Sequence, residues 1–312
     1  MNIPENIDCI LHGDSLEIIK NIPDESIDCV ITSPPYYQLR DYGWDGQWGL
    51  EKTYQEFLDK LIALMSELKR VLKPTGTMWI NLGDSYMNNS SYSAAGRQGF
   101  GRDKIGMIYK SDDRIQQKSL MLIPHRFAIR CIDELGLILR NDIIWAKRNG
   151  MPESVTDRFS KKHEFFFFFV KQQKYYFDLD GVREKIITNE KRDKRIVYNS
   201  SKEDETNKTN TFIPPNPNGK NPGDVSDFWD IPTQPSSEKH YATYNFKLID
   251  KPIIAGCPEG GIILDPFCGT GTTLVRAIQL GRQGIGIDGN QEYCEIAQKR
   301  IEKELTQLKL AI

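Results

Sequence analysis

The sequence has few of the residues on which secreted, metal-binding and membrane proteins depend. It contains six cysteines and four histidines in 312 residues, with no Cys-x-x-Cys pair and no spacing typical of metal ligands. The longest obvious apolar run covers residues 165–170, far short of the roughly 20 residues of a membrane helix. The polar, acidic start Met-Asn-Ile-Pro-Glu is unlike a signal peptide. We therefore expect a cytoplasmic protein with reduced thiols, no metal and no membrane segment.

The sequence also lacks an excess of either charge. Lys and Arg number 41 and Asp and Glu 43, so the net charge of −2 argues against a purely electrostatic, histone-like binder of nucleic acid. The charge is nevertheless polarised, because residues 1–60 carry −8 and residues 97–174 carry +7. This basic segment suits phosphate contacts, although scattered solvated charge is the alternative for any single residue. The candidate DNA contacts are Arg97, Arg102, Lys104, Lys147 and Arg148.

The order of apolar segments predicts an α/β protein of one or two domains. Predicted strands cover residues 9–11, 27–32, 77–82, 138–146, 165–170, 262–264 and 284–287, and predicted helices cover 54–72, 123–135, 273–280 and 292–308. Such alternation indicates a parallel sheet with right-handed crossovers. The apolar run 165–170 fits a strand buried on both faces. Residues 84–118 and 185–227 break the pattern and are predicted to be a long functional loop and a linker or small variable module.

A glycine-containing turn follows the predicted strand 262–264 and opens a helix. It reads Asp265, Pro266, Phe267, Cys268, Gly269, Thr270, Gly271 and Thr272, and Asp288 ends the next strand 23 residues after Asp265. Glycines let the backbone approach a ligand, and an acid at this offset can bind ribose hydroxyls. The third glycine of a dinucleotide site and the lysine of a nucleotide triphosphate site are both missing. A nucleoside ligand, S-adenosylmethionine, fits better than an ordinary strand-to-helix turn.

A second turn, Ser33-Pro34-Pro35-Tyr36, follows the predicted strand 27–32. Two prolines fix the backbone and present preceding carbonyl groups as acceptors. The Ser33 hydroxyl and the Pro34 carbonyl could bind the amino protons of a nucleobase, whose lone pair is otherwise delocalised. Tyr36 could stack on a base swung out of the helix. The alternative is a rigid proline turn followed by a surface tyrosine.

With both turns the sequence resembles the DNA amino-methyltransferases, over nearly its whole length. Supporting segments are 12–14 (His-Gly-Asp), 145–152 (Trp-Ala-Lys-Arg-Asn-Gly-Met-Pro) and 240–244 (His-Tyr-Ala-Thr-Tyr). The catalytic turn precedes the cofactor turn, which is similar to the permuted β class. The resemblance implies a circularly permuted Rossmann-like fold with a mostly parallel seven-stranded sheet. It places the catalytic half in residues 1–170, the target-recognition region in 171–235 and the cofactor-binding half of the same domain in 236–312.

The resemblance also implies roles for individual residues. The catalytic motif is Ser33, Pro34, Pro35 and Tyr36, and the turn 265–272 approaches the methionine end of S-adenosylmethionine. Asp288 matches the ribose-binding acid, and Asp14 lies where the family places a carboxylate near the adenine ring. Thr243 and Phe246 fall in the segment that covers the methionine moiety, which usually carries proline where this chain has Asn245.

A serine before Pro-Pro-Tyr is commoner in family members that methylate the N4 amine of cytosine, whereas aspartate is commoner for the N6 amine of adenine. A neutral hydroxyl can both accept from the amine and donate to cytosine N3. The sequence thus predicts a cytosine-N4 methyltransferase of a restriction-modification system, acting on double-stranded DNA alongside a cognate endonuclease, with a homodimer left open. The alternatives are adenine N6 methylation and a non-catalytic, sequence-specific DNA-binding protein with this fold.

Overall fold

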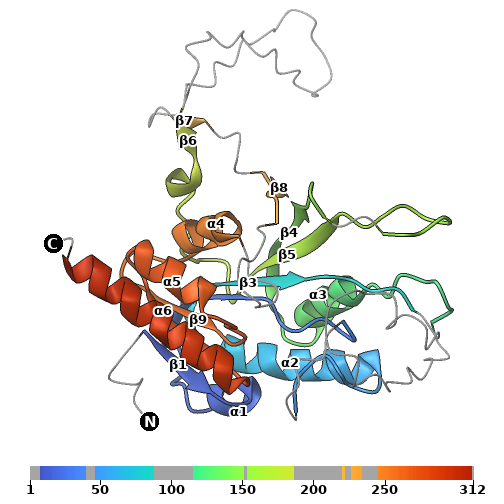
Figure 1. Cartoon of the computed structure of the whole chain (residues 1–312), viewed down its shortest axis with the longest axis horizontal. Coiled ribbons are helices and arrows are strands. Elements are labelled where there is room, and N and C mark those ends of the chain that lie inside the picture. The colour runs from blue at the N-terminus through green and yellow to red at the C-terminus, as the bar shows by residue number, and fades with distance from the viewer. Residues whose placement is uncertain are drawn as a thin grey trace, which may run out of the picture.

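One central sheet contains eight strands within the residues that the structure, a computed structural model, describes (8–39, 46–87, 115–150, 153–185, 220–221, 226–233 and 245–310). The strands are β1 (Cys9–His12), β2 (Ile27–Thr32), β3 (Leu72–Leu82), β4 (Ile138–Ala146), β5 (His163–Val170), β8 (Phe228–Asp230), β9 (Ile262–Asp265) and β10 (Gln283–Asp288). Their order is β1-β10-β9-β2-β3-β5-β4-β8 (Figure 1). A separate pair joins β6 (Glu184–Lys185) to β7 (Lys220–Asn221).

Strands from the two ends of the chain interleave in this sheet. β9 and β10 lie between β1 and β2, and every neighbouring pair from β1 to β3 is parallel. Only β5 runs against its neighbours, β3 and β4. The prediction of a mostly parallel, permuted sheet is confirmed. The eighth strand, β8, adds an edge to the seven expected, because three residues of the variable region pair with the end of β4.

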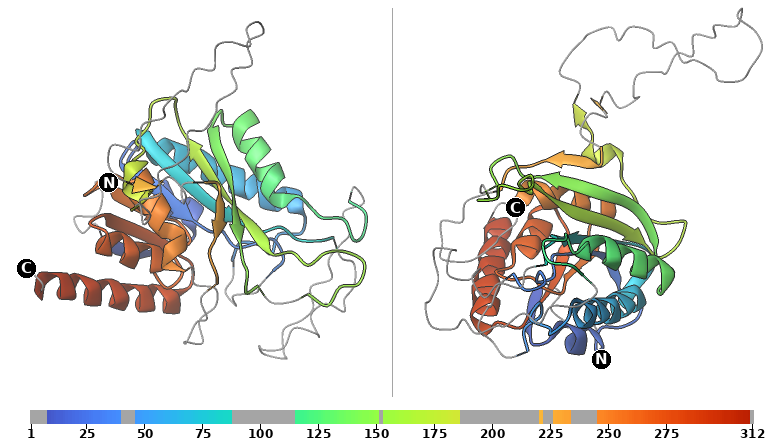
Figure 2. Two further views of the ribbon diagram at one scale, coloured as in Figure 1. Left: turned by 90° about the horizontal axis from the view of Figure 1, so that it is seen from above. Right: turned by 90° about the vertical axis from the view of Figure 1, so that its right-hand side faces the viewer.

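Helices cover both faces of the sheet. One face carries α1 (Ser15–Ile19), α2 (Tyr54–Val71) and α3 (Ile123–Asp133), and the other carries α4 (Phe246–Gly256), α5 (Thr272–Gln279) and α6 (Gln291–Leu310) (Figure 2). A short 3-10 helix, η1, covers Asp180–Val182. Helix α2 buries Phe57, Leu61, Leu64 and Leu68, whose spacing of three and four residues gives one apolar stripe.

The phenylalanine run in β5 lies in the core, as predicted. Phe167 and Phe169 pack with Phe127 of α3 on one face, whereas Phe168 stacks on Trp79 on the other, with ring centroids 4.0 Å apart. Successive strand residues point to opposite faces, so an uninterrupted apolar run supplies both cores. These rings are therefore structural and not a platform for bases.

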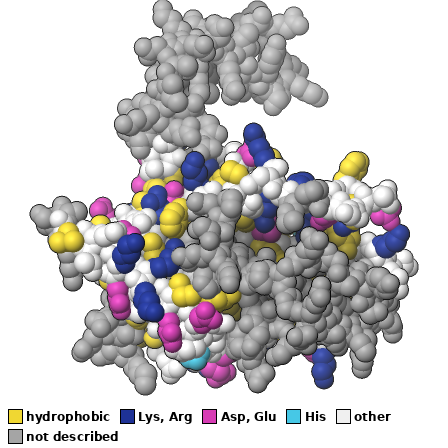
Figure 3. Space-filling model, in the orientation of Figure 1, with side chains coloured by type: hydrophobic (Ala, Val, Ile, Leu, Met, Phe, Trp, Pro, Cys, Tyr) yellow, Lys and Arg dark blue, Asp and Glu magenta, His cyan; other side chains and the backbone are white. Residues whose placement is uncertain are grey.

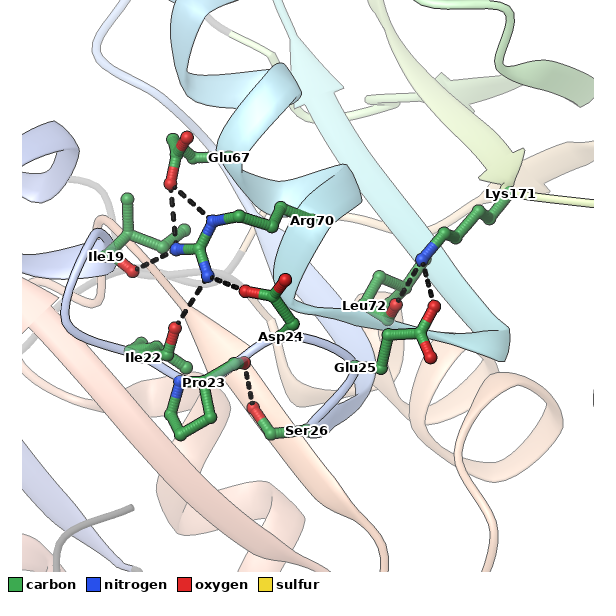
Figure 4. A network of polar contacts seen from close by, with 10 residues as sticks. All are labelled: Ile19, Ile22, Pro23, Asp24, Glu25, Ser26, Glu67, Arg70, Leu72 and Lys171. Carbon is green, nitrogen blue, oxygen red and sulfur yellow. Dashed lines mark hydrogen bonds and ion pairs between the residues drawn. The ribbon is translucent and has the colours of Figure 1, made fainter. Parts of the chain in front are cut away.

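Arg70 fixes the segment that leads into β2. Its guanidinium donates to the carbonyl groups of Ile19 and Ile22, each at 2.9 Å, and pairs with Asp24 and Glu67 (Figure 4). The last turn of a helix leaves carbonyl groups without intrahelical partners. Arg70 thus joins α2 to the end of α1 and to the turn before β2, the strand that leads into Ser33-Pro34-Pro35-Tyr36.

Among the described residues, no helix is both long enough and apolar enough to cross a membrane. In the same residues, no three His, Cys, Asp or Glu side chains are grouped as a metal site. Arg97, Arg102, Lys104 and Thr243, which the sequence analysis proposed for DNA and cofactor contacts, lie outside the described residues.

Candidate active site

The two predicted motifs meet where the sheet changes its winding direction. Strands β2 and β9 are parallel neighbours. The chain leaves β9 through α5 toward β10 on one side and leaves β2 through α2 toward β3 on the other. Open α/β sheets bind ligands at the carboxyl ends of strands at such a switch point. Ser33 follows β2 there and Pro266 follows β9, so the fold brings together turns that are distant in the sequence.

Asp265 joins the two turns directly. Its carboxylate accepts a hydrogen bond from Thr32 Oγ1 at 2.7 Å, 233 residues away in the chain, and another from Thr273 Oγ1 at 2.6 Å. Phe267 N donates to the same carboxylate at 3.1 Å. Asp265 is buried, and burial raises its pKa to about 6 against the opposing effect of these donors. Its carboxylate therefore fixes the geometry between β9 and β2.

The two glycines of the turn, Gly269 and Gly271, are favoured at their positions for different reasons. Gly269 and Gly271 both adopt positive φ angles, +52° and +78°. A Cβ atom on Gly271 would lie 2.9 Å from Ala297 Cβ in α6, so only glycine lets this helix pack closely. A Cβ atom on Gly269 would meet nothing within 4 Å. Gly269 therefore presents backbone to open space that a ligand can enter, which fits the predicted nucleoside cofactor.

Asp288 lies directly beside this glycine turn. Its Oδ2 accepts from Gly269 N at 2.9 Å and its Oδ1 from Asn290 N at 2.8 Å. Burial raises its pKa. Each carboxylate oxygen can accept a second hydrogen bond, so Asp288 can still accept from ribose hydroxyls in this position.

Four other residues of the turn, Pro266, Cys268, Thr270 and Thr272, are buried. The Cys268 thiol is buried, and burial raises its pKa well above the ordinary value. Pro266 offers its carbonyl to the hydroxyl of Ser15 in α1. Arg300 of α6 donates to the Thr270 carbonyl at 2.6 Å. It also lies 3.3 Å from Thr272 Oγ1. These four positions shape the turn, and their predicted contact with the cofactor stays a prediction.

The carboxylate of Asp14 is engaged by the protein itself. Oδ1 accepts from Leu16 N at 2.9 Å as the N-cap of α1, and Oδ2 accepts from the indole of Trp48 at 2.8 Å. Trp48 is buried and meets Phe267 edge-on, with ring centroids 5.1 Å apart. Asp14 thus holds an aromatic wall beside the glycine turn, and its predicted contact with adenine stays a prediction.

The turn from Ser33 to Tyr36 is supported from β3 and β5. The Tyr36 hydroxyl lies 2.7 Å from Glu164 Oε2 and 3.0 Å from Asn81 Oδ1. Ser33 Oγ lies 3.4 Å from the same Asn81 oxygen. A Cβ atom on Gly83 would lie 2.5 Å from the Tyr36 ring, so the glycine makes room for that ring. Ser33 and Tyr36 are therefore held together at the switch point, beside the carboxyl end of β2.

A family model described as DNA methylase matches residues 27–299, which span both turns and the sheet between them. The chain belongs to the DNA methylase family. Curated relatives include the Type II methyltransferase M.Cfr9I of Citrobacter freundii, 37% identical over 300 residues (95% of this chain, 88% of the relative). The Type II methyltransferase M.SmaI of Serratia marcescens is 34% identical over 298 residues (94% and 90%). The predicted family is thereby confirmed.

Solved structures show the same fold as this DNA methylase. The PvuII DNA methyltransferase (cytosine-N4-specific) matches with a TM-score of 0.63 at 20% identity, covering 96% of this chain and 91% of the other. A putative DNA modification methylase of Thermus thermophilus, complexed with S-adenosyl-L-methionine, matches with a TM-score of 0.59 at 24% identity, covering 96% of both. The predicted Rossmann-like fold is confirmed, and so is S-adenosylmethionine as the cofactor of this family.

The two described basic residues that were predicted to contact DNA are both paired within the methylase. Lys147 forms an ion pair with Glu164 Oε1 and lies 4.1 Å from the centroid of the Trp145 ring. Arg148 pairs with Asp230. On the face drawn in Figure 3, Lys and Arg side chains are interspersed with Asp and Glu. Lys147 therefore supports Glu164 from inside, and its contact with DNA stays a prediction.

Several supporting residues of the methylase were missed from the sequence. Asn81 and Glu164 stand in or beside apolar strand segments, and a polar residue in a buried strand is a usable signal for a functional position. Arg300 and Trp48 carry no such signal, because their partners lie in distant parts of the chain. Phe246 begins α4, where Asn245 caps the helix by accepting from Lys247 N at 3.1 Å. That cap gives a physical reason for Asn245 in place of the family's proline.

Proposed function

We propose that this DNA methylase transfers a methyl group from S-adenosylmethionine to the N4 amine of cytosine in a flipped-out base. The observation that carries the proposal is the Ser33 hydroxyl, held beside Asn81 and Tyr36 at the switch point. A hydroxyl can accept from the amine and donate to cytosine N3, whereas an ionised carboxylate in its place would repel the N3 lone pair.

Each residue of the site has its own role in the proposed methyl transfer. When bound, the cofactor supplies an electrophilic methyl group, and Gly269, Phe267 and Asp288 are the residues that would hold it. The Ser33 hydroxyl and the Pro34 carbonyl bind the amino protons and localise the lone pair of the amine. Tyr36 stacks on the base.

The proton of the amine leaves after methyl transfer and passes to water. Ser33 is a poor general base. Of the nearby carboxylates, Glu164 is engaged by Tyr36 and Lys147, and Asp265 is buried beneath two threonine hydroxyls. Neither is placed to take a proton from the substrate, which supports direct attack by the neutral amine.

We assign the enzyme to a restriction-modification system, in which a cognate endonuclease acts on the same sites. The support is the Type II designation of its relatives. We also assign residues 171–235 to target recognition. In support, the indole of Trp145 in β4 donates to the Ile231 carbonyl at 2.7 Å, and Asn149 donates to the Thr233 carbonyl at 2.7 Å. Ile231 and Thr233 of this region thus lie beside the carboxyl end of β4.

Transfer of tritium from labelled S-adenosylmethionine to genomic DNA tests the activity, and nucleoside digestion with mass spectrometry identifies the base. We expect N4-methylcytosine from the wild-type chain and no product from Ser33→Ala. Adenine N6 methylation is the second candidate because the family model covers both amines. N6-methyladenine as the only product would overturn the base assignment, and no incorporation at all would favour a non-catalytic DNA-binding protein.

A further inference from the structure

Phe159 is the most exposed of the large hydrophobic residues that the structure describes. It is 96% exposed, whereas Ile129 on the surface of α3 is 56% exposed. It lies in the connection between β4 and β5, which extends away from the sheet (Figures 1 and 2). A phenylalanine at this exposure gains nothing from the hydrophobic effect in the isolated protein, so its burial by a partner is favourable.

The connection that carries Phe159 is braced. Glu153 accepts from the guanidinium of Arg158 and, at 3.3 Å, from Lys161 N, on either side of Phe159. The guanidinium of Arg158 also lies 3.8 Å from the centroid of the Tyr86 ring. Phe159 is therefore presented to solvent by a fixed scaffold.

The base of the connection is fixed as well. Lys147 N donates to the Lys162 carbonyl at 2.8 Å and closes the connection at the sheet. Lys118 pairs with Asp157 at 2.7 Å, two residues before Phe159. The two ends of the connection are thus joined at the sheet, and an exposed ion pair lies near Phe159.

The position of the connection points to DNA as the partner. Residues 147–150 and 153–162 contain five Lys or Arg and two Asp or Glu, and three of the basic residues, Lys147, Arg148 and Arg158, have carboxylate partners. Phe159 is five residues before Glu164, which holds Tyr36, so the two Cα atoms are at most about 18 Å apart. A duplex whose target base reaches the catalytic turn therefore passes close to Phe159.

We propose that Phe159 inserts into the base stack of bound duplex DNA and fills the space that the flipped-out target base leaves. The inference rests on the base flipping of the proposed function. Apolar side chains that enter a base stack offset the cost of unstacking, which is a few kcal/mol per step. The contacts of Glu153 with Arg158 and Lys161 hold the described residues around Phe159, so that less ordering is needed when the side chain meets the duplex.

The test compares two duplexes that carry the recognition site identified by sequencing modified bases. In one duplex the target base is paired, and in the other it lies opposite a mismatch and is already unpaired. We expect Phe159→Ala to lower kcat/KM about tenfold or more on the paired duplex and to have less than about a threefold effect on the mismatched one. Phe159→Trp should retain most activity on both duplexes. Ile129→Ala, which removes a different exposed apolar side chain, should change neither value.

An equal loss of kcat/KM on both duplexes would overturn the proposed insertion of Phe159, because Phe159 would then act as an ordinary DNA contact. So would a change from dimer to monomer in Phe159→Ala during size-exclusion chromatography, since the side chain would then cover a second copy of the chain. Fluorescence of 2-aminopurine at the target position gives a readout independent of methyl transfer. If the wild-type chain transfers no methyl group, the proposed function fails. In that event the site is identified by selection of bound duplexes. Equal fluorescence for wild type and Phe159→Ala then overturns the insertion of Phe159, and a weaker signal in the variant supports it.

Discussion

The Tyr36 hydroxyl lies at the centre of a small polar network. Glu164 binds it with one carboxylate oxygen and pairs with Lys147 through the other, and both Glu164 and Lys147 are largely buried. A hydrogen bond to an ionised group is stronger than a neutral one. The ion pair of Glu164 therefore fixes the orientation of the ring that is proposed to stack on the base.

Replacing Glu164 by glutamine should lower kcat while leaving the KM for S-adenosylmethionine unchanged. The amide still accepts from Tyr36, but it loses the charge, which is worth about 1.5 kcal/mol or more and corresponds to about a tenfold effect on the rate. Single-turnover methylation measures this. Tyr36→Phe combined with Glu164→Gln should be no slower than the slower single variant, because both changes break one contact. Additive losses would contradict the network.

Asp265 should make stability depend on pH. Its pKa is raised from 3.8 to about 6 in the folded protein, so between these values the folded state binds more protons than the unfolded state. The free energy of unfolding should therefore fall by about 2 kcal/mol as pH rises from about 4 to about 6. Asp288, whose pKa is also raised, contributes with the same sign.

Urea unfolding at several pH values between 4 and 7 checks this. Asp265→Asn cannot titrate and should show a flatter fall across that range, with the part due to Asp288 remaining. An unchanged slope would mean that the Asp265 carboxylate is not held in the buried environment between Thr32 and Thr273.

At the scale of elements, the spacing of apolar residues predicted the positions of helices and strands. The helix predicted at residues 54–72 is α2 (Tyr54–Val71), and the strand predicted at 138–146 is β4. Apolar stripes and proline or glycine ends are local signals, so they can be read without the fold. Strand β8 was missed because three residues hold no period, and their partner in β4 lies far away in the sequence.

The two turns of the candidate site could be predicted from the sequence, whereas the contacts between them could not. Both turns follow apolar strands and have distinctive residues, so Ser33 and Gly269 could be found from sequence. The contacts that hold these turns depend on the order of strands in space. Thr32 and Asp265 meet only because β9 lies beside β2, and no local pattern of either strand encodes that pairing.

The bridge between α1, α2 and the turn before β2 should depend on Arg70. Arg70→Ala leaves the Ile19 and Ile22 carbonyl groups without these donors and should lower the free energy of unfolding by about 2 kcal/mol. Asp24→Ala removes an exposed ion-pair partner and should cost less than about 1 kcal/mol. Denaturant unfolding compares the two variants. Equal losses would mean that the ion pair, and not the carbonyl contacts, holds the bridge.

The near-neutral net charge of the whole molecule is the sum of an acidic and a basic segment. The structure shows that many of these charges are locally paired. Lys147, Arg148 and Arg158 of the basic segment all have carboxylate partners. The electrostatic attraction for DNA therefore depends on fewer residues than the segment's charge of +7 implies. The predicted contacts Arg97, Arg102 and Lys104 are the first to test.

Changing these three residues to glutamine should flatten the salt dependence of DNA binding by about one unit of slope for each true phosphate contact. Fluorescence anisotropy with duplex DNA at increasing salt concentration measures the slope. Lys299→Gln with Lys303→Gln, two exposed positions on α6, serves as the control and should leave the slope unchanged. The same slope in the triple variant would remove residues 97–104 from the DNA interface.

The central claim is that the turn Ser33 to Tyr36 directs methyl transfer to the N4 amine of cytosine. Mass spectrometry of nucleosides from DNA treated with the enzyme and labelled S-adenosylmethionine tests it most directly. We predict labelled N4-methylcytosine with the wild-type chain and its loss with Ser33→Ala. Labelled N6-methyladenine alone, or no labelled nucleoside, would contradict the claim.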